Sequence, residues 1–454
     1  MYSGTTIRKI LLPLTGMLEF TSTGRNSEKC LEHRTNTLLY TNSYYLVADV
    51  AAVSLFGFAF WAITARLYSP AQFGIASATI AAITLLARIS QVGLDYSIIR
   101  FLPKAGENAN SMINTCFTIA TLTGLTSAIL FIAVLNLWSP ALLHIRQPLS
   151  APLFVVLIVL YTLLLMIERT FIARRNAKYV LFKNTLAGVM KVATAILVVF
   201  LLSTTCIIVS WGIAILFTLL LSLLIFLPRI QPQYRPRFEL NIKLIRNMLH
   251  FSLGNYTAGL LWIAPFMLFP LMVVNILGTE ANAYFYIPWI IAQTLFGIPL
   301  AVSYSLFAEG SANEKTLYAN IGKSLTLCLL ILVPTILFLV LFSSQLLLFF
   351  GKLYSINGSY LLRILAFSVI PVSINFIGLS VMRVRKHTRL VIVVTALSAC
   401  LAIALGYLLM TQSGLAGIGI AWIVTQILTA LFVIVYLFYT RLGRFVPDVP
   451  TESD

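Results

Sequence analysis

Polar and charged residues recur at helical spacing inside the second long apolar run of the chain, residues 72–99. The polar residues of this run include Ser77, Thr84, Arg88, Gln91 and Asp95. Steps of seven, four, three and four residues place these five on one face of a helix. A charge at membrane depth costs about 2.5 kcal/mol or more unless it faces other helices or water. We therefore expect this face to line a polar cavity. The alternative is an ion pair between Arg88 and Asp95, which also requires an interior that tolerates charge.

A second buried cation is predicted in the first half of the chain. Lys191 lies mid-way along the apolar run 179–203, on a helix face with Asn184, Gly188 and Thr194. It is about twelve residues, or ~18 Å, from either end of the run, too far for its ammonium to reach the interface. We expect Lys191 to line the same cavity as Arg88 and to favour an anionic ligand. Pairing of Lys191 with Asp49 or Asp95 is the alternative.

The second half of the chain offers uncharged polar groups at membrane depth. Asn255, Gln293 and Asn375 lie in apolar runs that could face a central cleft. Amide groups together with aromatic faces suit the hydroxyls and carbon faces of sugars. Amides in membrane helices also serve as hydrogen-bonded contacts between helices, which is the alternative role. Substrate-binding candidates are therefore Arg88, Lys191, Gln91, Asp95, Asn255, Gln293 and Asn375.

The composition indicates a polytopic membrane protein. Of 454 residues, 59% are hydrophobic and only 10% are charged, and the mean hydropathy is +0.95. The net charge of +17 comes from short basic clusters between apolar runs, so no nucleic-acid partner is expected. The five cysteines are far apart and form no CxxC motif. We expect no metal, no cofactor and no disulfide framework.

Twelve apolar runs predict an all-α membrane protein with about 12 transmembrane helices. The first six lie at 44–66, 72–99, 111–137, 150–172, 179–203 and 206–228, and the second six at 247–277, 282–308, 317–342, 359–382, 388–411 and 414–440. The predicted organisation is an N-terminal extension (1–43), an N-lobe (44–228), a polar linker (229–246), a C-lobe (247–440) and a tail (441–454).

Basic residues lie mainly on one side of this topology. The side that holds both termini carries 25 Lys and Arg residues, including the cluster from Arg169 to Lys183, whereas the other side carries three. The positive-inside rule therefore places the extension, the linker and the tail in the cytoplasm. We expect a multi-pass protein of the cell (cytoplasmic) membrane with both termini cytoplasmic.

The two halves resemble each other. Three unlike pairs share an offset of 209–211 positions: Trp211 with Trp422, Arg174 with Arg383, and Pro70 with Ala281. Because each half has six spans, the two copies have the same orientation in the membrane. The sequence thus predicts two pseudo-symmetric six-helix lobes around a central cleft.

Two segments carry a family resemblance. FAFWAITARLYSPAQFG (58–74), followed by Gly93-Leu94-Asp95 and Arg100-Phe101-Leu102-Pro103, resembles the N-terminal signature of polysaccharide-biosynthesis membrane proteins, the Wzx-type lipid-linked oligosaccharide flippases. GLAGIGIAW (414–422) is similar to the start of the last helix in that group. The wider group is the multidrug, oligosaccharidyl-lipid and polysaccharide exporter superfamily. The resemblance implies an alternating-access transporter.

Three functions are then open. A flippase for a lipid-diphosphate-linked oligosaccharide fits two cavity cations, with membrane lipids and polysaccharide assembly proteins as further candidate partners. A drug or organic-cation antiporter on the same fold would be expected to use unpaired carboxylates within its spans. A membrane-embedded glycan polymerase would need a sizeable loop with acid, base and Arg groups, whereas the loops near 138–149 and 343–358 contain few ionisable residues. We therefore expect a transporter rather than an enzyme.

Overall fold

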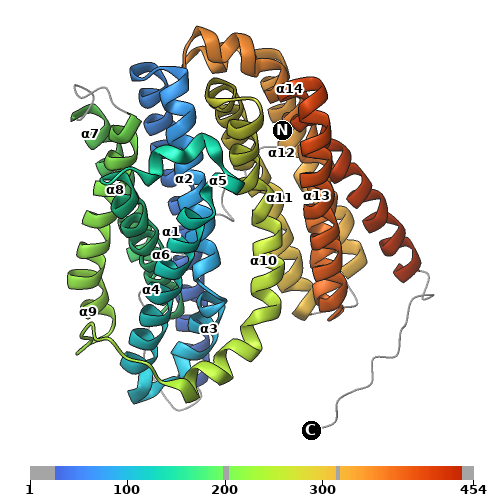
Figure 1. Ribbon diagram of the computed structural model, residues 1–454. Coiled ribbons are helices and arrows are strands. Elements are labelled where there is room, and N and C mark those ends of the chain that lie inside the picture. Colours follow the sequence, from blue (N-terminus) through green and yellow to red (C-terminus); the bar gives the residue numbers. More distant parts are fainter. Residues whose placement is uncertain (1–25, 198–203, 313–316, 442–454) are drawn as a thin grey trace, which may run out of the picture.

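The structure is a computed structural model that describes residues 26–197, 204–312 and 317–441. All the regular elements in these ranges are helices, as predicted, and most of the long ones stand side by side in an upright bundle (Figure 1). Eleven helices of the described chain are long and apolar enough to cross a membrane. They follow from continuous apolar runs of about 20 residues or more.

In the first half of the chain, the helices are α1 (Asn26–Leu67), α2 (Pro70–Ser90), α3 (Leu94–Phe101), α4 (Ala109–Ala133), α5 (Leu135–Trp138), α6 (Ser150–Ala173), α7 (Ala177–Leu197), α8 (Thr204–Leu221) and α9 (Leu227–Ile230). In the second half, they are α10 (Ile242–Ile276), α11 (Thr279–Ala312), α12 (Leu317–Leu348), α13 (Lys352–Val384) and α14 (Thr388–Arg441). A π-helical turn, Ser222–Phe226, joins α8 to α9.

The 54-residue α14 supplies two crossings rather than one. Its backbone leaves the helical conformation at Gly414 (φ 60°, ψ −138°). The two arms then fold back on each other. Their backbones are so close that a Cβ added at Gly417 would lie 2.0 Å from the carbonyl oxygen of Leu409. Residues eight apart in one straight helix would be about 12 Å apart. The hairpin gives the predicted spans 388–411 and 414–440, and hence about twelve crossings.

The span predicted as one helix over 72–99 is broken. α2 begins with a capping box, in which the Ser69 side chain accepts a hydrogen bond from the Gln72 backbone N–H and the Gln72 side chain accepts one from Ser69. It ends at Ser90, and the next turn has left-handed backbone at Val92 (φ 47°) and Gly93 (φ 80°). A Cβ at Gly93 would lie 3.0 Å from Ser252 Oγ, so the break lets α10 approach closely. The prediction of a single continuous helix through residue 99 is therefore wrong.

The internal repeat is confirmed at the turn between α6 and α7 and at its counterpart between α13 and α14. Arg175 (φ 55°) and Lys386 (φ 59°) are both left-handed and lie 211 positions apart. Each turn has the same three hydrogen bonds at that offset, for example Asn176 N–H to Phe171 O (3.0 Å) and His387 N–H to Met382 O (2.9 Å). Sequence-distant halves thus share both the helix order and the local backbone.

Residues 231–241 connect the halves and run along the end of α4 that lies at the lower edge of Figure 1. We call this edge of the bundle the linker end. Asn114 donates to the carbonyl of Arg235 (3.0 Å), and the backbone N–H of Glu239 donates to Thr118 Oγ1 (3.1 Å). The polar side chains of α4 thereby satisfy the extended linker backbone. The residue boundaries of the two lobes and the linker stay a prediction, and residues 1–25 and 442–454 lie outside the described part.

Hydrogen bonds join the halves at both ends. Toward the linker end, Tyr256 Oη donates to the carbonyl of Ile89 (2.7 Å), in the last turn of α2. At the opposite end, Arg66 donates to the carbonyls of Leu348 (2.8 Å) and Phe349 (2.7 Å), where α12 stops. Asn282 there donates to the carbonyl of Gly74 (2.8 Å).

Candidate functional site

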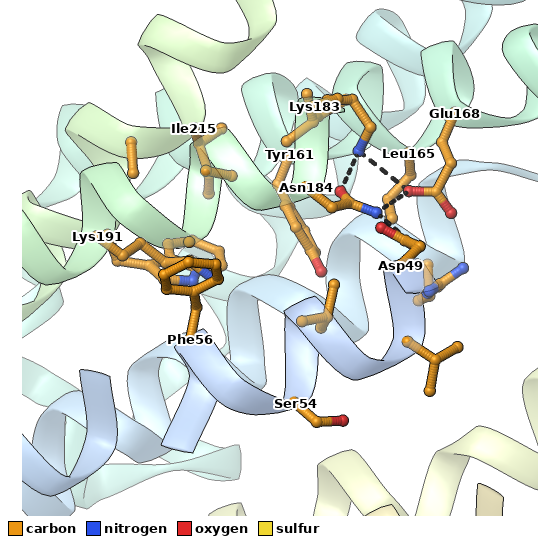
Figure 2. A pocket seen from close by; sticks show the side chains of 18 residues that line it. Asp49, Ser54, Phe56, Tyr161, Leu165, Glu168, Lys183, Asn184, Lys191 and Ile215 are labelled. Carbon is orange, nitrogen blue, oxygen red and sulfur yellow. Dashed lines mark hydrogen bonds and ion pairs between the residues drawn. The ribbon is translucent and has the colours of Figure 1, made fainter. Parts of the chain in front are cut away.

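A cavity of about 340 Å³ lies inside the first half of the chain, between α1, α2, α6, α7 and α8 (Figure 2). We call it the charged cavity. Its charged side chains are Arg88, Lys183, Lys191, Asp49 and Glu168. All five come from membrane-spanning helices, so the apolar bundle holds three cations and two carboxylates around one space. Charges inside membrane-spanning helices make this cavity the candidate functional site.

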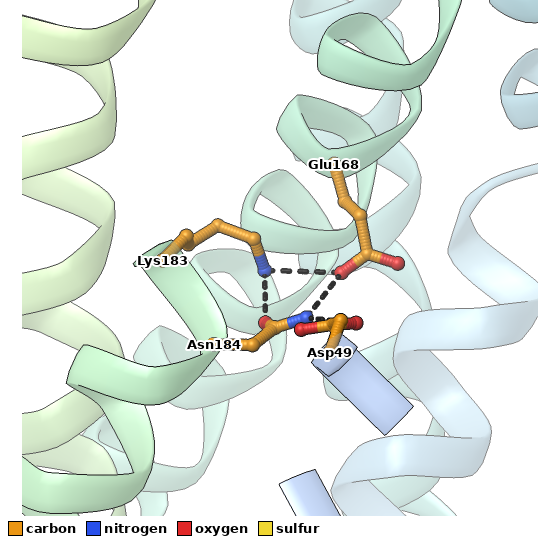
Figure 3. A network of polar contacts seen from close by, with 4 residues as sticks. All are labelled: Asp49, Glu168, Lys183 and Asn184. Atoms are coloured by element: carbon orange, nitrogen blue, oxygen red, sulfur yellow. Dashed lines mark hydrogen bonds and ion pairs between the residues drawn. The ribbon is translucent and has the colours of Figure 1, made fainter. Parts of the chain in front are cut away.

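Four of the lining residues form a hydrogen-bonded network, shown in Figure 3. Lys183 Nζ donates to Glu168 Oε2 (3.0 Å) and to Asn184 Oδ1 (2.6 Å). Asn184 Nδ2 donates to Asp49 Oδ2 (3.1 Å) and makes a longer contact with Glu168 Oε2 (3.4 Å). The Lys183 side chain is only 2% exposed, so the network neutralises this ammonium inside the protein.

Arg88 and Lys191 are different. In the described part of the chain, neither side chain has a hydrogen-bonded or ion-paired partner, although both line the charged cavity. The alternatives that paired Arg88 with Asp95, or Lys191 with an aspartate, are therefore wrong. Two cations at membrane depth that make no ion pair or hydrogen bond with a described side chain can bind an anionic group of a ligand.

Helical spacing on α7 explains the position of Lys191. Asn184, Gly188 and Lys191 all line the charged cavity, as their spacing predicted. A Cβ at Gly188 would lie 2.5 Å from Phe56 Cβ, so the glycine lets α1 pack closely and brings Asp49 to the network. Thr194, predicted on the same face, instead donates to the carbonyl of Ser210 on α8 (3.0 Å).

Gln91 and Asp95 line a smaller space of about 60 Å³ rather than the charged cavity. Arg88 also lines this space, and Tyr256 closes it from α10. The side chain of Gln91 is 2% exposed, and its Nε2 has no partner among the described residues. Burial raises the pKa of Asp95, and the nearby guanidinium of Arg169, with a smaller effect from Arg88, opposes this shift.

Gln293 lies in a third space of about 360 Å³ between the two halves, which we call the aromatic cavity. α2 and α6 line it on one side with Thr84, Arg88 and Tyr161. Helices α10, α11 and α13 line the other side, where four of the lining residues are aromatic, among them Trp262. Arg88 thus borders all three spaces, and Arg88 and Tyr161 form a common wall of the charged and aromatic cavities.

Two other predicted site residues are placed elsewhere or not described. Asn375 is buried and donates to the carbonyl (3.0 Å) and Oε1 (2.8 Å) of Gln426, so it joins α13 to α14 and lines none of the three spaces. The side chain of Asn255 lies outside the described residues. Ser77 accepts a hydrogen bond from Asn282 (3.1 Å) and belongs to the contact between the halves. Direct substrate binding by the predicted set stays a prediction.

Glu168 and Lys183 were missed as cavity residues. Lys183 was assigned to a basic cluster outside the membrane, but it lies in α7 and is buried. Glu168 lies in the apolar run predicted over 150–172, seven residues after Tyr161, which lines the same cavity. Both residues lie one or two turns inside the end of a predicted span, and a charged residue at such a position was the signal that could have identified them as cavity residues.

The fold and the cavities define a two-lobed polytopic membrane protein with charged and aromatic spaces inside it. The chain belongs to the polysaccharide biosynthesis protein family, whose model matches residues 63–356, in agreement with the resemblance found in the sequence. Among curated proteins, a putative O-antigen transporter of Shigella flexneri is 28% identical over 185 residues, which are 40% of this chain and 44% of that relative. The match thus spans less than half the length of the relative.

Similar solved structures have the same fold. An inward-facing multidrug-resistance MATE transporter of the MOP superfamily aligns with a TM-score of 0.67 at 14% identity, covering 88% of this chain and 96% of its own. Lipid II flippase MurJ in an inward closed conformation also gives 0.67, at 13% identity, with 89% and 94% covered. A Pyrococcus furiosus MOP transporter, described as having a binding pocket of reverse polarity, gives 0.62 at 13% identity, with 90% and 96% covered.

Proposed function

We propose that the protein is a flippase that moves a lipid-diphosphate-linked oligosaccharide from the cytoplasmic to the outer leaflet for surface polysaccharide or glycoconjugate assembly. The observation that carries this proposal is a pair of cations, Arg88 and Lys191, that line one cavity at membrane depth and have no hydrogen-bonded partner among the described residues. The three cations and two carboxylates of the cavity leave it with a net positive charge, which a diphosphate would offset. Charge-assisted hydrogen bonds to phosphate oxygens are strong in a poorly hydrated site. The O-antigen transporter match and the family support the same substrate class.

The contacts between the halves support alternating access. Side-chain donors, Tyr256 toward the linker end and Arg66 at the opposite end, hold carbonyls at helix ends of the other half. Such contacts can break and reform without disturbing the helices themselves. In this proposal the linker end is cytoplasmic, as the distribution of Lys and Arg predicts, and the protein carries its substrate without chemical change.

An organic-cation antiporter is the second candidate, because Asp49 and Glu168 face the same cavity. These carboxylates already accept hydrogen bonds from Lys183 and Asn184, however. A cationic substrate would have to compete with Lys183 and would meet two further cations. The charge balance therefore favours an anionic substrate.

The test uses purified protein in proteoliposomes with a fluorescent lipid-linked oligosaccharide. Arg88→Gln and Lys191→Met are expected to reduce flipping at least tenfold, while the amount of folded protein stays unchanged, because each removes a phosphate partner rather than an internal contact. Matched controls are Arg389→Gln and Lys352→Met, whose side chains line none of the three spaces. Wild-type protein that exchanges organic cations for protons or sodium but leaves the lipid in place would overturn the proposal.

A further inference from the structure

The aromatic cavity adjoins the charged cavity but has a different chemical character. Among the described residues that line it, Arg88 alone is charged, and Arg88 and Tyr161 also line the charged cavity. A ligand part bound beyond this common wall would therefore be adjacent to a group held by Arg88. Its volume, about 360 Å³, lies within the usual size of small-molecule sites, roughly 300–1,000 Å³.

Packed rings make the far wall of the aromatic cavity rigid. Trp262 packs against Phe376 (centroids 4.7 Å apart) and Phe266 (5.5 Å). Phe266 in turn packs against Trp289 (5.4 Å) and Trp422 (5.3 Å) in the apolar core of the second half. Trp262 is only partly buried, so one part of its indole remains available to the cavity. Such a wall presents a preformed apolar surface to a ligand.

The polar groups of the same wall are unused. Within the described ranges, neither the Gln293 amide nor the Trp262 indole N–H has a hydrogen-bond partner, although both residues line the cavity. Gly297, one helical turn after Gln293, lines the cavity with open space around its Cβ position. A flat apolar surface with a free amide and a free N–H is suited to a pyranose ring, which has a carbon face and hydroxyl edges.

We propose that the aromatic cavity is the subsite for the sugar linked directly to the diphosphate, with Trp262 against its carbon face and Gln293 on its hydroxyls. This inference rests on the proposed flippase function and adds a division of the site. Arg88 at the common wall meets the phosphate, and the second half of the chain selects the sugar. Substrate specificity is therefore set mainly by α10 and α11, whereas affinity for phosphate is set by α2 and α7.

The experiment compares two fluorescent lipids in proteoliposomes, a polyprenyl diphosphate that carries a sugar and the same lipid without it. Three variants alter the sugar subsite. Trp262→Ala removes the surface, Gln293→Leu removes the amide at similar size, and Gly297→Leu fills the open space. Each is expected to slow flipping of the glycosylated lipid roughly three- to tenfold, as for loss of one hydrogen bond or ring contact, and to leave the sugar-free lipid unchanged.

Controls separate this proposal from the function on which it rests. Gly322→Leu is matched to Gly297→Leu, because Gly322 is also helical with open space at Cβ but lines no cavity described here. Arg88→Gln should slow both lipids. Wild-type protein that moves neither lipid would refute the flippase function itself. If wild type moves both and the three variants slow both equally, the cavity holds a part common to both lipids, such as the isoprenoid, and the sugar subsite is wrong. Unchanged rates for both lipids in all three variants would equally overturn it.

Discussion

Two lysines on α7 face the same cavity with opposite expected roles. Lys183 is 2% exposed and bound to Glu168 and Asn184, whereas Lys191 has no partner among the described residues. Replacing each with Met removes one charge and keeps a flexible apolar side chain. We expect Lys183→Met to lower stability strongly, and Lys191→Met to abolish transport while leaving stability nearly unchanged.

The size of the stability effect follows from what Lys183→Met leaves behind. Glu168 Oε2 loses its 3.0 Å contact with the ammonium and keeps only the 3.4 Å contact with Asn184. Breaking a buried pair in this way costs about 3–5 kcal/mol, because the remaining charge is uncompensated. Glu168 keeps 23% of its side-chain surface exposed, so we expect the lower end, about 3 kcal/mol. Lys191→Met breaks no internal pair and should cost well under 1 kcal/mol.

The assay is thermal aggregation of detergent-solubilised protein, together with flipping in proteoliposomes. The double variant Lys183→Met with Glu168→Gln removes both charges and should recover most of the stability lost in the single variant. Equal melting temperatures for the two lysine variants would contradict the assignment of paired and free cations. So would a double variant that is no more stable than Lys183→Met alone.

Further predictions concern topology, gating and pH. A cysteine at Arg237 should be labelled only from the cytoplasm and one at Gln147 only from outside; labelling of both from one side would refute the orientation. Arg66→Gln removes two hydrogen bonds between the halves and should speed labelling of a cysteine at the buried Ser77 several-fold, whereas unchanged labelling would exclude a gating role. Burial raises the pKa of Asp95, so the ionised form is the costly one. The stability gain of Asp95→Asn, measured by thermal aggregation, should therefore grow as pH rises above about 4, and a gain that is largest in acid would contradict this.

The membrane-spanning helices could be predicted well from the sequence, because each depends on the composition of its own segment. Apolar runs of sufficient length define spans, and the break at Gly414 and the turns at Arg175 and Lys386 lie where these runs end. The break at Val92 and Gly93 was harder to predict, because the apolar periodicity continues through it. Its stabilisation comes from α10, more than 150 residues away, through Tyr256. Such a tertiary contact leaves little trace in the periodicity of the run itself.

The site was predicted in part for the same reason. Helical spacing correctly predicted that Lys191 and Arg88 line a cavity, because the direction of each side chain is set by its position on its own helix. Spacing could not show which lysine is paired, because Glu168 and Lys183 meet across two helices. It also could not separate Gln293, which lines a cavity, from Asn375, which joins two helices. Both are amides in apolar runs, and only the packing of neighbouring helices distinguishes them.

The repeat makes the polarity of the site a property of one lobe. At the offset of 211 fixed by the Arg175 and Lys386 turns, the partners of Glu168, Lys183 and Lys191 are Leu379, Val394 and Ala402. All three partners are buried apolar residues. The second lobe therefore has packed apolar core at the positions where the first lobe has a charged cavity. A symmetric pair of charged cavities would bind two phosphate groups far apart. One charged lobe facing one aromatic lobe instead suits the ligand we propose, an anion joined to a sugar, and would orient it with its phosphate toward the first lobe.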